Sequence, residues 1–90
     1  MPYIDKAHRK EWAEVLKPLL MRIESDNPSE GELNYLITRI VHEWIAAHGV
    51  SYKTYNAAVG VLGCAQQELY RRKVAPYEDE KIASPNHGDV

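Results

Sequence analysis

The shortest connection in the chain constrains its fold most. Residues 30–48 and 51–75 both show apolar residues at helical spacing, and only Gly49 and Val50 separate them. A link of two residues between helices leaves room only for an antiparallel hairpin. Gly49 is also the expected C-terminal stop of the first of these helices, because glycine readily adopts the conformation that ends a helix. The sequence therefore predicts a long antiparallel helical hairpin.

A further helix is expected on each side of the hairpin. Apolar residues recur through residues 5–24, and Asp5 is suited to cap the N-terminus of that helix. Pro18 removes one backbone hydrogen bond there, so we expect a kinked helix or two short ones. Pro76 should end or kink the second hairpin helix, and a short C-terminal helix or tail follows it. Residues 84–90 are predicted to be an irregular tail.

Local capping patterns support these boundaries. Ser29 and Glu32 have capping-box spacing directly after Asn27-Pro28, and Ser51 is a candidate N-cap for the second hairpin helix. No stretch shows the alternation of a strand. We therefore expect an all-α fold, and a chain of 90 residues predicts one domain that covers residues 1–90.

Composition excludes several classes of protein. The formal net charge of −2 argues against a general nucleic-acid binder, which would be strongly basic. The single cysteine, Cys64, excludes an internal disulfide framework and fits a reducing cytosol. The first ten residues contain no apolar run like that of a signal peptide, and no stretch approaches 18 apolar residues. We expect a cytoplasmic protein without a membrane span.

Several short motifs resemble those of a family of short, functionally uncharacterised proteins found largely in phages, prophages and bacteria. The similarity extends over residues 31–90, and it implies a phage-related context but no particular reaction. The matching motifs are Gly31–Tyr35 (GELNY), Tyr52 with Asn56, Tyr70-Arg71-Arg72, Pro76-Tyr77-Glu78 and Gly88-Asp89-Val90.

A polar cluster is predicted at the open end of the hairpin. In an antiparallel pair with its turn at Gly49-Val50, Asn34 lies opposite Gln66. One interpretation is a hydrogen-bonded amide pair that sets the helix register. Another is a small-nucleotide site in which amides read a base, tyrosines stack and arginines hold phosphate. That site would use Asn34, Tyr35, Gln66, Tyr70, Arg71 and Arg72.

The basic run Arg71-Arg72-Lys73 has two interpretations of its own. Its side chains project about 100° apart on a helix, so they do not form one patch. An ion-paired helix C-terminus explains them, because positive charge is favourable there. A contact with phosphate or nucleic acid is the alternative.

A strip of small residues on the second hairpin helix suggests self-association. Gly60 and Gly63 each cost about 1 kcal/mol relative to alanine inside a helix, so a flat face must compensate. Such a face lets another backbone approach closely, either the N-terminal helix or a second subunit. We expect a homo-oligomer, most simply a dimer. The strip consists of Asn56, Ala57, Gly60, Gly63, Cys64 and Gln67, and Cys64 is expected to be an inert, buried thiol.

Catalytic patterns are sparse. Helical nucleotide pyrophosphohydrolases hold Mg²⁺ with two acidic pairs, and this chain has one, Glu11 and Glu14. These two carboxylates are better explained as a solvated face. The four histidines lack the spacing of metal ligands. We therefore assign no catalytic residue, no metal ligand and no cofactor.

These observations lead to a ranked set of functions. The first is a non-enzymatic, self-associating small helical interaction module, a phage-related accessory or host-modulating protein with a host or phage protein as partner. The alternative is a sponge-like protein that binds a small nucleotide. A metal-dependent nucleotide pyrophosphohydrolase is the distant alternative.

Overall fold

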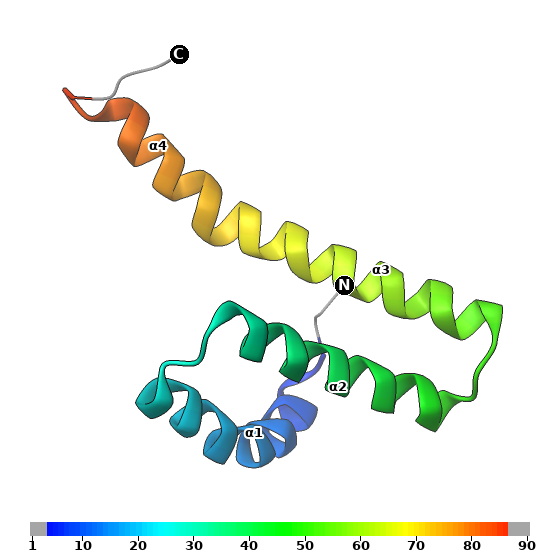
Figure 1. Cartoon of the computed structure of the whole chain (residues 1–90). Helices are drawn as coiled ribbons and strands as arrows, with labels where there is room; N and C mark the ends of the chain where they lie inside the picture. The colour runs from blue at the N-terminus through cyan, green and yellow to red at the C-terminus, as the bar shows by residue number, and fades with distance from the viewer. Residues whose placement is uncertain (1–3, 87–90) are drawn as a thin grey trace. The chain divides into compact units, whose positions relative to one another are not determined.

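A computed structural model of the chain describes residues 4–86, and all its regular structure is helical. The predicted all-α fold is confirmed: the described residues form successive helices, in the order that the sequence predicts, and no strand (Figure 1). Ser84–Asn86 form a bend and a turn, and the rest of the predicted tail lies outside the described residues. The helical elements are α1 (Lys6–Asp26), α2 (Glu30–His48), α3 (Tyr52–Leu69), the π-helical segment η1 (Tyr70–Val74) and α4 (Ala75–Ala83).

Helix α1 begins at the predicted cap and passes through its proline. The Asp5 side chain accepts a hydrogen bond from the backbone N–H of His8, at 3.1 Å, which satisfies one of the unpaired donors of the first turn. Pro18 lies inside a single helix rather than between two short ones. The helix ends at Asn27, whose left-handed backbone (φ 49°) turns its N–H to the Ile23 carbonyl at 3.0 Å.

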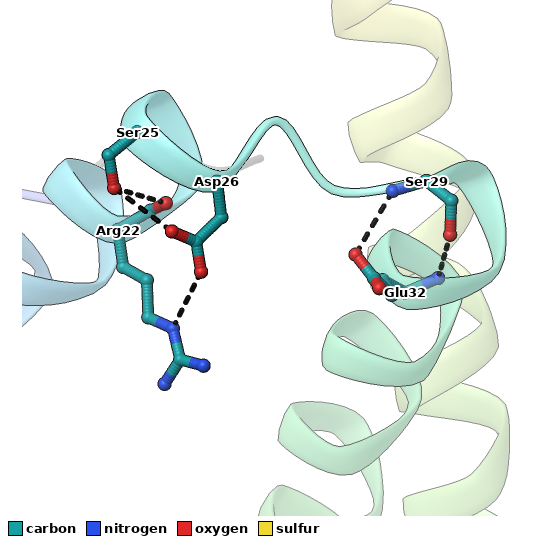
Figure 2. Close-up of polar contacts among 5 residues, drawn as sticks. All are labelled: Arg22, Ser25, Asp26, Ser29 and Glu32. Atoms are coloured by element: carbon teal, nitrogen blue, oxygen red, sulfur yellow. Dashed lines mark hydrogen bonds and ion pairs between the residues drawn. The ribbon is translucent and has the colours of Figure 1, made fainter.

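The start of α2 is fixed by a reciprocal capping box, as predicted. The backbone N–H of Glu32 donates to Ser29 Oγ at 3.2 Å, and the backbone N–H of Ser29 donates to Glu32 Oε2 at 3.1 Å (Figure 2). On the other side of the linker, Arg22 Nε donates to Asp26 Oδ2 at 3.1 Å. Each helix end is thus held by side chains within one turn of it.

The connection between α2 and α3 has the predicted composition. Gly49 adopts a positive φ of 93°, and its N–H donates to the Ile45 carbonyl at 3.0 Å. A side chain at this φ would be strained, which explains the glycine. Ser51 Oγ then accepts from the backbone N–H of Thr54 at 3.1 Å and caps the start of α3.

The chain forms two compact units, one that ends at Tyr55 and one that begins at Asn56. The first unit contains α1 and α2. The second contains most of α3, together with η1 and α4. The prediction that residues 1–90 form one domain remains a prediction.

Apolar side chains remain largely exposed in both units. Among the described residues only Ala58 is buried, at 5% exposure. In the first unit, α1 and α2 do not pack closely along their lengths. Large apolar side chains such as Trp12 (60% exposed) and Ile40 (58% exposed) therefore remain in contact with solvent. Half-buried apolar residues occur near the linker, at Leu19, Ile23, Pro28 and Leu36, and farther along α2, at Val41 and Ile45.

Segment η1 joins α3 to α4 without a break in helical structure. The backbone N–H of Ala75 donates to the carbonyl of Tyr70, five residues earlier, which defines the wide π turn. Pro76 follows directly. It has no N–H, and in a regular α-helix its ring would press against the Arg72 carbonyl four residues earlier. The wide turn accommodates the proline, so the helix continues where the sequence predicts an end or a kink.

Candidate interaction site

The residues of the predicted nucleotide site are divided between the two units. Asn34 and Tyr35 lie on α2 in the first unit, and both interact within their own helix. Thr38 Oγ1 donates to Asn34 Oδ1 at 3.2 Å, and Arg39 Nη1 donates to Tyr35 Oη at 3.3 Å. The Arg39 guanidinium also lies 6.0 Å from the centre of the Tyr35 ring, within the range of a cation–π contact.

The other four residues belong to the second unit. Gln66 is exposed on α3, and Tyr70, Arg71 and Arg72 lie in η1. The Glu68 carboxylate contacts both guanidinium groups, at 3.2 Å from Arg71 Nη2 and through Nε of Arg72. The two arginines thus take part in ion pairs at the end of α3. Nucleotide binding remains a prediction, and so does an amide pair between Asn34 and Gln66.

Tyr70 and Glu78 form a contact across the π turn that sequence reasoning missed. The Tyr70 hydroxyl donates to Glu78 Oε1 at 2.9 Å, eight residues along the chain. In a regular α-helix the aligned residue would be Tyr77, seven positions on, but the π turn inserts one residue and brings Glu78 into line. The signal that could have indicated this contact is Pro76, which makes a local widening of the helix favourable.

This contact changes the acidity of the tyrosine. The hydrogen bond to Glu78 raises the pKa of Tyr70 above its usual value of 10.0, and the negative charge of Glu78, partial desolvation and the charge of Asp79 act in the same direction. The hydroxyl therefore keeps its proton, and its role as a donor, to a higher pH than a free tyrosine does.

Charge is segregated along this part of the second unit. Arg71, Arg72 and Lys73 form a basic block, and Glu78, Asp79 and Glu80 form an acidic block; all six residues are exposed. Four residues, 74–77, separate the two blocks. Beyond the acidic block, Lys81 Nζ lies 5.3 Å from the centre of the Tyr77 ring. The segment from Leu69 to Ile82 thus combines opposite charges with exposed Leu69, Val74, Tyr77 and Ile82.

The predicted self-association strip lies on α3 and is open. A Cβ built at Gly60 or Gly63 meets no neighbouring atom within 4 Å. Cys64 is exposed, so the prediction of a buried thiol is wrong. The physical reason is local: the residue one turn before Cys64 is Gly60, which has no side chain to shield the sulfur. The other members of the strip, Asn56, Ala57 and Gln67, are exposed as well.

The first unit contains an open groove near its linker. Its volume is about 960 Å³. Leu19, Ile23 and Leu36 form its apolar part, and Arg22 with Asp26 lies along its rim. The charged residues of its lining are Arg22 and Asp26, which form an ion pair, and Glu32, whose carboxylate takes part in the capping box of α2.

Histidines and carboxylates form no metal centre in residues 4–86. No group of three or more His, Cys, Asp or Glu side chains there could hold a metal ion. His8 Nδ1 lies 3.0 Å from Asp5 Oδ1, and His48 stacks on Trp44 with ring centres 4.1 Å apart. Within that same range, none of the helices has the length and apolar character needed to cross a membrane.

Comparisons with known proteins give a family but no relative of established function. Neither the curated proteins nor the solved structures yield a match. The family match extends over residues 1–90, and the chain therefore belongs to the domain-of-unknown-function family DUF6899.

Proposed function

We propose that this chain is a self-associating helical interaction module in which a second copy covers part of the exposed apolar surface. The observation that carries the proposal is the burial pattern: Ala58 alone is buried among the described residues, while more than twenty large apolar side chains are exposed. Burial of one such side chain contributes about 1.5–3 kcal/mol. A chain of this length therefore has much to gain from association.

The helix ends support a surface role for these side chains. Caps at Asp5, Ser29 and Ser51 satisfy the first turns of the three long helices with local groups. Local caps set where each helix begins, but most helical stability in proteins comes from packing of an apolar face, so the exposed faces of these helices favour a contact. Coverage of such faces by a partner is the usual explanation for large exposed apolar area.

The cellular context follows from the motifs rather than from the fold. The similarity of Gly31–Tyr35 and Tyr70–Arg72 to phage and prophage proteins favours a phage-related accessory or host-modulating role in the cytosol. The lone cysteine fits a reducing compartment.

Sedimentation equilibrium of the purified chain over a wide concentration range tests the proposal. We expect twice the mass of one chain at high concentration and a reversible fall toward one chain on dilution. Native mass spectrometry should give the same stoichiometry. A protein that remains a monomer at every concentration would contradict the proposal.

A further inference from the structure

The segment from Leu69 to Ile82 has a charge pattern that is complementary to itself. Its midpoint lies between Ala75 and Pro76, with the basic block Arg71–Lys73 on one side and the acidic block Glu78–Glu80 on the other. Each block begins three residues from the midpoint, so the two are placed symmetrically. The whole segment is helical, as η1 and α4.

The symmetric placement of the two charged blocks favours an antiparallel orientation of a second copy. When two such helices lie antiparallel with their midpoints together, each basic block lies beside the acidic block of the other copy. When they lie parallel and in register, like charges face each other, which is unfavourable. A two-fold axis gives the first arrangement, in which both copies use the same surface.

The apolar residues of the segment suit the same arrangement. Leu69, Val74 and Tyr77 are 59%, 38% and 58% exposed. The π turn inserts one extra residue between Leu69 and Tyr77. Two helical turns therefore contain eight residues here, and these two side chains lie on one helix face. In the antiparallel pair Val74 of one copy lies level with Tyr77 of the other. A valine against an aromatic ring beside the axis gives the contact an apolar centre.

Pairs within the chain do not remove the complementarity. Arg71 and Arg72 contact Glu68, and Tyr70 contacts Glu78. Within the segment, the basic half contains three positive side chains and no carboxylate, and the acidic half contains three carboxylates and one lysine, Lys81. Each half of the segment therefore keeps a net charge of its own sign, and the field between copies depends on that net charge.

We propose that Leu69–Ile82 binds the same segment of a second copy, antiparallel, about a two-fold axis near Ala75 and Pro76. This inference rests on the proposed self-association and specifies the surface that carries it. The ion pairs set orientation and partner choice, Val74 and Tyr77 form the apolar contact beside the axis, and Leu69 extends it toward the end of the segment.

Charge-swap variants test this pairing. The double variant Asp79→Lys/Glu80→Lys makes both halves basic, and Arg72→Glu/Lys73→Glu makes both acidic. Each should weaken dimerisation at least about tenfold, because like charges then face each other in either orientation. The quadruple variant that combines all four changes exchanges the blocks, restores antiparallel complementarity and should return the dissociation constant to near the wild-type value.

Cysteine cross-linking tests the orientation. In a Cys64→Ser background, Val74→Cys lies beside the axis and should form an intermolecular disulfide under mild oxidation. Leu69→Cys is the matched control, since its two copies lie about 20 Å apart along antiparallel helices at 1.5 Å per residue. Cross-linking of Leu69→Cys as fast as Val74→Cys would overturn the antiparallel arrangement.

The outcomes separate this inference from the proposal on which it rests. A wild-type monomer would contradict self-association itself. A wild-type dimer whose affinity is unaffected by either double variant would preserve self-association and exclude this segment. A quadruple variant as weak as the doubles would show that the blocks do not pair across copies. Circular dichroism of each variant confirms that its helices are retained.

Discussion

The two units of this molecule differ in how their polar side chains are used. In the first unit these side chains serve local structure: Ser29 and Glu32 cap α2, and Arg22 pairs with Asp26 one turn away. In the second unit Glu68 also pairs locally with Arg71 and Arg72, but no side chain caps the junctions of η1 with its neighbours, and the charges of residues 71–80 are grouped by sign. Local caps define a helix, whereas segregated charge defines a surface. Because its charges are segregated, the second unit is the better candidate for specific association.

The largest effect on dimerisation is expected from a change at Leu69 in the second unit. Leu69→Glu should place a carboxylate in the apolar contact, close to the acidic block of the second copy, and convert the dimer to a monomer at concentrations where wild type associates. Val61→Glu is the matched control, because Val61 is equally exposed (61% against 59%) but lies outside the segment. Light scattering measures both masses. Loss of the dimer in Val61→Glu but not in Leu69→Glu would contradict an interface at Leu69–Ile82.

Replacement of the proline should separate helix stability from association. Pro76→Ala supplies the missing N–H and removes the clash, so the π turn can revert to a regular α-helix. Helical signal should rise, and dimerisation should weaken because Leu69 and Tyr77 leave the common face. Pro18→Ala in α1 is the matched control: it should raise helix stability and leave the mass unchanged. Equal dimer affinity in both variants would contradict a role for the π turn.

Loss of the capping box should affect only the first unit. Ser29→Ala removes the acceptor for the Glu32 N–H and should cost about 1 kcal/mol of helix stability. Hydrogen exchange should show this as faster exchange in the first turn of α2. Ser25→Ala, an exposed change in the last turn of α1, should cost less than about 0.5 kcal/mol. A fall in dimer affinity with Ser29→Ala would mean that the first unit contributes to the interface.

The contact across the π turn should appear in the titration of Tyr70. Its raised pKa means that the native state favours the protonated hydroxyl, so the stabilisation is complete below the ordinary tyrosine pKa and is lost as pH rises through the higher native value. Glu78→Gln should lower the Tyr70 pKa toward that ordinary value. Carbon NMR of the tyrosine ring carbons measures it. An unchanged pKa in the variant would contradict the hydrogen bond.

The smallest effect is expected on the glycine strip. Gly60→Leu enters open space and should neither unfold the chain nor change its mass, because the proposed interface lies at Leu69–Ile82. A fall to a monomer in light scattering would instead place the interface on the strip, as the sequence predicts.

How far the sequence determines this structure depends on the range of the interactions. The caps at Asp5, Ser29, Ser51 and Gly49 were predictable because each requires only a residue type and a spacing within one turn. The Tyr70–Glu78 contact was not, since a regular helical period aligns Tyr70 with Tyr77. The state of Cys64 was predicted wrongly because small residues on a helix indicate close packing only when a neighbour covers them.

The self-complementary charge pattern was visible in the sequence but could not be interpreted there. On a helix that ends or kinks at Pro76, the basic and acidic blocks belong to separate elements. Only a helix that continues through η1 into α4 places them on one rod with a common midpoint. The continuity depends on the π turn, and Pro76 by itself does not distinguish such a turn from a helix end or a kink.

Hydrogen exchange of the wild-type chain shows directly whether Leu69–Ile82 is the surface that binds a second copy. The chain is measured at concentrations above and below its dissociation constant. We predict that association adds protection at the backbone amides of Leu69–Ile82 and leaves the protection of the α1 amides unchanged. Added protection confined to the first unit, or none at any concentration, would contradict it.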